Sequence, residues 1–145
     1  MNTDFSPVPE LMTPLQGRKV LVLGLGDSGL AMARWCVRAG AQVTVADTRA
    51  APPQLAALQA ELAQVGFVAG AFDAQLVNGQ GLDAIYRSPG LSPASINPIL
   101  IAASAGGIRA GGELSLYSMA LRTLRATQGY APAVLAITGT NGKTT

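Results

Sequence analysis

The chain contains no histidine and one cysteine, Cys36, among its 145 residues. Without histidine, this segment has no imidazole for general-base catalysis or for metal binding. A single cysteine can form neither an internal disulfide nor a cysteine cluster, and its thiol is expected to be a small buried hydrophobe. Chemistry based on imidazole, disulfides or thiolate clusters is therefore excluded within this segment.

Charge is also scarce, at 12% of residues with a net charge of +2. This balance is too small to indicate nucleic acid or a membrane surface as a partner. No apolar run approaches the ~20 residues of a membrane span. Residues 1–16 carry two acids and no basic-then-apolar pattern, so they do not resemble a signal peptide. We expect a cytoplasmic, monomeric protein with a loose lead-in at 1–16, followed by a folded domain.

The strongest local pattern is a glycine turn that follows an apolar run. Residues 20–23 are continuously apolar, as in a strand that is covered on both faces. Gly24, Gly26 and Gly29 then follow in G-x-G-x-x-G spacing. The first glycine permits a tight turn, the second lets a phosphate approach the backbone, and the third lets a helix pack closely. Free N–H groups at the start of that helix predict an anion site.

Two further motifs follow expected strands. Asp47 ends the strand expected over 42–47, where an acid in a βαβ nucleotide fold usually meets a ribose hydroxyl. A plain strand-end cap is the alternative for this residue. The turn at 88–90 follows the strand expected over 83–87 and is either a ligand contact or an ordinary turn. In a parallel sheet, all of these ends meet at one edge.

The rest of the chain alternates between helical and strand patterns, which indicates an α/β fold with a parallel sheet and helices on both faces. Segment 73–81 fits neither pattern. Helices are expected over 28–39, 55–65, 95–105 and 113–125, and further strands over 67–69, 108–110 and 133–137.

The last residues, 138–145, follow the expected strand 133–137 directly and have the order typical of a P-loop. In such a loop Lys143 reaches the β- and γ-phosphates of ATP, and Thr144 can hold Mg²⁺. Ile137 occupies the place of the usual first glycine, so a chance glycine turn is the alternative. Lys143 is the expected catalytic residue. The expected ATP-binding residues are Gly139, Thr140, Asn141, Gly142, Lys143, Thr144 and Thr145.

A phosphate loop needs the helix that follows it, for the helix dipole and for its shape. Because the sequence ends at Thr145, we expect the front of a longer protein. Residues 17–130 form its first domain, and 131–145 begin an ATP-binding domain that is cut short. Alone, this segment is expected to bind ATP weakly or not at all.

The segment 138–144 strongly resembles the ATP loop of the Mur ligases, which build the peptidoglycan precursor. That family uses a shortened T-G-[TS]-N-G-K-[ST] loop, so Ile137 fits it. Further motifs, in the expected order, narrow the resemblance to the members that add D-glutamate, with the alanine-adding members as the alternative. These motifs are Gly24–Gly29, Asp47–Arg49, Ser88–Gly90 and Gly112–Leu114.

The resemblance implies a Rossmann-like first domain that binds a UDP-sugar rather than NAD. The backbone around Asp27 and Ser28 would face the diphosphate, and Gly90 would lie beside the uracil. The uridine end would be held by Asp47, Thr48 and Arg49.

The resemblance also implies the reaction. ATP with Mg²⁺ would phosphorylate the carboxylate of UDP-N-acetylmuramoyl-L-alanine, and the amine of D-glutamate would attack the acyl phosphate to give an amide. Further metal ligands and the D-glutamate pocket would lie beyond Thr145.

Two rival functions remain at this point. An NAD(P)-dependent oxidoreductase domain fits the glycine motif and Asp47, but the phosphate loop argues against it. A non-enzymatic nucleotide sensor with the same fold is the other. A UDP-sugar site also requires Asp47 and residues 88–90 to lie beside the glycine turn.

Overall fold

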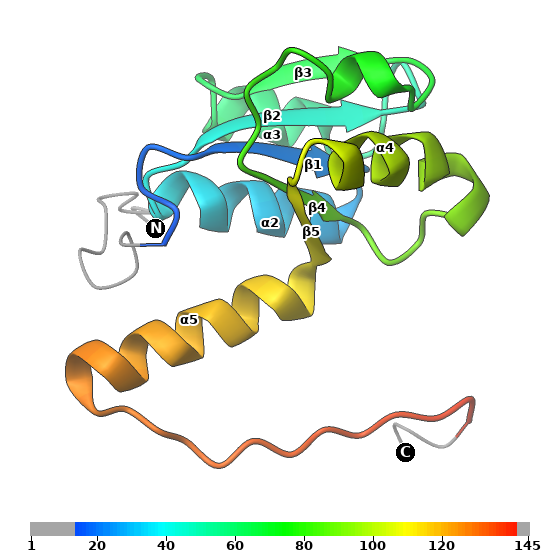
Figure 1. Ribbon diagram of the computed structural model, residues 1–145. Helices are drawn as coiled ribbons and strands as arrows, with labels where there is room; N and C mark the ends of the chain where they lie inside the picture. The colour runs from blue at the N-terminus through cyan, green and yellow to red at the C-terminus, as the bar shows by residue number, and fades with distance from the viewer. Residues whose placement is uncertain (1–13, 142–145) are drawn as a thin grey trace.

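The computed structural model of the protein describes residues 14–141. Its centre is a five-stranded sheet in the order β3-β2-β1-β4-β5, in which all neighbouring strands are parallel (Figure 1). The strands are β1 (Lys19–Leu23), β2 (Gln42–Asp47), β3 (Gly66–Ala69), β4 (Ala84–Arg87) and β5 (Arg109–Gly112). The helices are α2 (Asp27–Arg38), α3 (Leu55–Glu61), α4 (Pro93–Ala105), α5 (Glu113–Gln128) and the short 3₁₀ helix η1 (Ala74–Leu76). The predicted Rossmann-like α/β fold is confirmed.

Two hydrophobic cores lie on opposite faces of the sheet. Val20 and Val22 of β1 belong to the core shared with α2, α3 and α5, whereas Leu21 and Leu23 belong to the core shared with α4 and η1. Side chains alternate between faces along a strand, so a central strand covered on both sides must be apolar throughout. This explains the uninterrupted apolar run before the glycine turn.

The glycine turn holds α2 close to the end of β1. Gly24 has φ +88°, in the left-handed region that favours glycine. A Cβ at Gly29 would lie 1.8 Å from the carbonyl oxygen of Gly24, so only glycine fits there. Gly26, by contrast, faces open space. The turn therefore has the backbone geometry expected of its first and third glycines.

The helix expected over 55–65 is shorter in the structure. α3 ends at Glu61, and the next residue, Leu62, leaves helical geometry at φ −128°. The chain must turn there because Gly66 already pairs with Thr44 in the sheet. Leu62 is nevertheless buried, so its helical spacing reflected a place in the core. The ambiguous segment 73–81 contains η1.

The strand expected over 133–137 is absent from the described structure. This segment is extended but pairs with no strand, and Leu135 is 92% exposed. In Figure 1 it continues from the far end of α5, away from the sheet. A strand needs a neighbour for its backbone hydrogen bonds, and the described chain offers none at this place. The apolar composition of segment 133–137 gives it a high strand propensity, but the described residues provide no neighbouring strand for it to pair with.

Cys36 lies in the core and is fully buried, as expected. Burial raises the pKa of its thiol to about 12, so the reactive thiolate does not form near neutral pH. Within residues 14–141, none of the helices is both long and apolar enough to cross a membrane.

Candidate functional site

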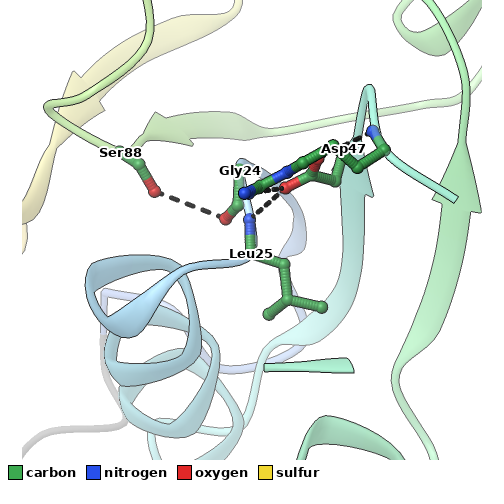
Figure 2. Close-up of polar contacts among 5 residues, drawn as sticks. Gly24, Leu25, Asp47 and Ser88 are labelled. Carbon is green, nitrogen blue, oxygen red and sulfur yellow. Dashed lines mark hydrogen bonds and ion pairs between the residues drawn. The ribbon is translucent and has the colours of Figure 1, made fainter. Parts of the chain in front are cut away.

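The sheet order places the ends of β1, β2 and β4 side by side, with the glycine turn between them. The backbone N–H of Gly24 donates to the carbonyl of Ala46 at 2.8 Å, which ties the turn to β2. On the other side, Ser88 donates from its backbone N–H to Leu23 at 2.9 Å and from its hydroxyl to the carbonyl of Gly24 at 3.3 Å (Figure 2). The three predicted motifs therefore meet at one edge, which is the arrangement that a UDP-sugar site requires.

Asp47 is only 2% exposed, and its carboxylate anchors this edge. Its Oδ2 accepts from the backbone N–H of Leu25 at 2.7 Å and from Nη2 of Arg49 at 2.8 Å (Figure 2). Its Oδ1 accepts from the backbone N–H and the Nε of Arg49, both at 2.9 Å. The carboxylate thus has the strand-end role that was the alternative to a ribose contact. Contact with a ribose stays a prediction that the present hydrogen bonds do not favour.

The hydrogen bonds from the Arg49 side chain lower the pKa of Asp47 to about 2, although burial alone would raise it. A carboxyl group whose pKa is lowered on folding adds stability above its unfolded pKa and loses it as pH falls toward the folded value. Asp47 is thus ionised in the folded protein throughout the physiological range.

We expect the stabilisation from the Asp47–Arg49 pair to disappear between about pH 4 and pH 2. The displacement of the pKa from 3.8 to about 2 corresponds to about 2 kcal/mol for all hydrogen bonds of the carboxylate together, of which the Arg49 side chain supplies the largest part. Urea unfolding at pH 5 and pH 2, on the wild type and on Arg49→Ala, measures this. The wild type should lose more stability than the variant over this interval. An equal loss in both would contradict the assignment.

The start of α2 presents backbone rather than side-chain donors. The N-cap is Gly26, and among the residues that the structure describes no side chain caps this helix. The first N–H groups of a helix have no partner within it, so with the open space beside Gly26 they can bind an anion. The arrangement suits a phosphate group of a nucleotide.

The polar side chains of the first turn of α2 are held by neighbouring elements. Asp27 accepts from Nε2 of Gln54 at 2.7 Å. Ser28 donates its hydroxyl proton to Oε2 of Glu113, the first residue of α5, at 3.2 Å. Sequence reasoning missed Gln54, which no motif marks, and included Glu113 in the Gly112–Leu114 motif without assigning it a contact. Both contacts join segments that lie far apart in the chain.

The remaining predicted residues divide into two groups. Thr48 and Gly90 are exposed at the sheet edge, and a Cβ at Gly90 would meet nothing within 4 Å. The phosphate-loop residues lie elsewhere: Gly139, Thr140 and Asn141 are exposed beyond α5. The described part of the chain contains no group of three acidic, histidine or cysteine residues that could hold a metal. Gly142, Lys143, Thr144 and Thr145 lie outside the described residues.

Comparison with known families shows which family this chain belongs to. Residues 18–112, which span the sheet and the glycine turn, match the family described as Mur ligase MurD-like, N-terminal domain. The chain belongs to the MurD-like Mur ligases. The match ends where α5 begins, so the MurD-like region contains all three motifs of the site.

Two relatives with high sequence identity support this family assignment. It is 63% identical over 134 residues to the UDP-N-acetylmuramoylalanine–D-glutamate ligase of Albidiferax ferrireducens, covering 92% of this chain and 26% of that protein. It is 59% identical over 133 residues to the ligase of the same name from Cupriavidus pinatubonensis, covering 90% and 26%. The MurD-like chain thus spans about a quarter of the length of these relatives.

Among solved structures, shikimate 5-dehydrogenase from Thermus thermophilus superposes with a TM-score of 0.48 at 22% identity, covering 86% of the MurD-like chain and 54% of the dehydrogenase. A likeness this distant carries no function from the dehydrogenase to this chain.

Proposed function

We propose that this chain is the UDP-sugar-binding front of a cytoplasmic ligase that adds D-glutamate to UDP-N-acetylmuramoyl-L-alanine. One observation carries the proposal: the glycine turn, Asp47–Arg49 and Ser88–Gly90 are joined by direct hydrogen bonds at one sheet edge. The identity to ligases named for this reaction supports it.

The substrate would lie across this edge. Its diphosphate would face the backbone around Asp27 and Ser28, where the first turn of α2 offers uncapped N–H groups and the helix dipole favours negative charge. The uridine end would reach Thr48 and Arg49, and Gly90 would leave room for the uracil. Such a pose needs the ends of β1, β2 and β4 together, as the sheet order has them.

The chemical step would take place in the ATP-binding domain that begins near residue 131. A carboxylate is a poor acceptor for an amine until one of its oxygens becomes a good leaving group, and transfer of the γ-phosphoryl group of ATP achieves this. Phosphoryl transfer needs positioning and neutralised charge, which Lys143 and a Mg²⁺ held by Thr144 would supply. The exposed apolar segment 133–137 is suited to become a strand of that domain.

The direct test uses the full-length protein with UDP-N-acetylmuramoyl-L-alanine, ATP and Mg²⁺. Release of phosphate should depend on D-glutamate, and Lys143→Ala should abolish it. In a matched control, UDP-N-acetylmuramate and L-alanine replace the two substrates. Phosphate release with this pair alone would assign the alanine-adding sibling instead, and release with neither pair would contradict ligase activity.

A further inference from the structure

The carboxylate of Asp47 already accepts four hydrogen bonds, two on each oxygen, at 2.7–2.9 Å. Two carboxylate oxygens offer about four lone-pair sites, so this group has no acceptor capacity left. Each oxygen accepts one hydrogen bond from a backbone N–H, that of Leu25 for Oδ2 and that of Arg49 for Oδ1. Each oxygen also accepts one hydrogen bond from the guanidinium of Arg49.

The full occupation of the Asp47 carboxylate affects which nucleotides this edge can bind. In dinucleotide-binding Rossmann folds, the acid at the end of the second strand accepts hydrogen bonds from the ribose hydroxyls of NAD. Asp47 stands at that position but cannot accept from a ribose diol while Arg49 is paired with it. We infer that Arg49 is a specificity-determining residue that closes this edge to NAD-type dinucleotides, and that Asp47 acts as its positioning residue. The inference does not rest on ligase activity.

Of the two paired residues, Arg49 is the one whose side chain can be removed without disturbing the core. Its Nε and Nη2 go to different oxygens of Asp47, so deleting the guanidinium frees one acceptor on each oxygen. One free acceptor on each oxygen is the pattern that neighbouring ribose hydroxyls require. The two backbone donors are not removed with the guanidinium, because the N–H of Leu25 belongs to the glycine turn and an alanine at position 49 keeps its own N–H. The Arg49 side chain is 54% exposed, so its removal opens the edge to solvent without leaving a buried cavity.

The test measures binding of NAD⁺, NADP⁺ and UDP to the full-length protein by calorimetry, for the wild type and for Arg49→Ala. The wild type should bind UDP, and its NAD⁺ affinity should lie at or below the detection limit of the titration, which is the reference for the variants. Arg49→Ala should gain NAD⁺ affinity by at least about tenfold, since two hydrogen bonds to a charged group become available. NADP⁺ should show no gain, because its 2′-phosphate replaces one hydroxyl and repels the carboxylate.

Two control variants separate the gain in NAD⁺ affinity from a general destabilisation of the fold. Arg34 forms a similar two-bond pair with Glu61, at 2.7 and 2.6 Å, between α2 and α3 and away from the edge. Arg34→Ala should therefore leave NAD⁺ binding absent. In Arg49→Ala/Asp47→Asn the gain should vanish, because an amide offers a single acceptor oxygen.

The inference is overturned if Arg49→Ala is folded, as judged by its circular dichroism spectrum, and still binds no NAD⁺. It is also overturned if NADP⁺ gains as much as NAD⁺, or if the wild type binds NAD⁺ as tightly as UDP. A ligase assay that fails while the NAD⁺ gain appears would reject the proposed function and leave this inference standing.

Discussion

Gly29→Ala is expected to lower the free energy of unfolding by at least about 3 kcal/mol, or to prevent folding. The added Cβ would meet the carbonyl oxygen and carbon of Gly24 at 1.8 and 2.8 Å. Both atoms are backbone, so no side chain can move aside and α2 itself must shift. That helix carries Leu30, Met32 and Cys36 into the core, and the shift would disturb their packing. Urea unfolding followed by circular dichroism measures the loss.

The matched control is a substitution at Gly26, three residues before Gly29. Gly26→Ala places a Cβ in open space with φ at −95°, which alanine adopts readily. Loss of glycine from the N-cap should cost less than about 1 kcal/mol. If the two variants were equally destabilised, the close contact between α2 and the turn would not explain the third glycine of the motif.

Gly26→Val is expected to keep the fold and to weaken UDP binding by at least about tenfold, since a lost phosphate contact of charged-hydrogen-bond strength corresponds to that factor. The backbone of Gly26 is already extended, so a β-branched residue fits without strain. Its side chain would fill the space through which a phosphate reaches the first N–H groups of α2. The wild type and the variant are compared by calorimetry with UDP and with uridine.

Uridine lacks the phosphates, so its affinity should change little between the two proteins. Unchanged UDP binding in a folded Gly26→Val variant would place the diphosphate elsewhere. A parallel loss for uridine and UDP would instead show that the side chain disturbs the whole edge.

The site could be predicted from the sequence where its geometry is local. The tight turn at Gly24 and the close packing at Gly29 follow from glycine spacing, because few backbone paths join a buried strand to a helix so directly. The meeting of the strand ends also followed, once the alternation of elements indicated a parallel sheet. These features need no knowledge of distant contacts.

Other features depend on contacts between distant residues, which cannot be inferred from the sequence. Asp47 could be placed at a strand end, but its full occupation by Leu25 and Arg49 is visible only in three dimensions. Leu62 has helical spacing and is buried, yet it follows the helix. Segment 133–137 has the composition of a strand, and composition cannot show whether a neighbouring strand exists.

The contact between Ser28 and Glu113 connects the first turn of α2 to the start of α5. A serine hydroxyl has a single proton to donate, so a phosphate oxygen that accepts it must take it from Glu113. The released carboxylate sits at the base of α5, and the chain runs from that helix toward the phosphate loop. An anion that accepts the Ser28 proton would therefore also change the surroundings of the first residue of α5.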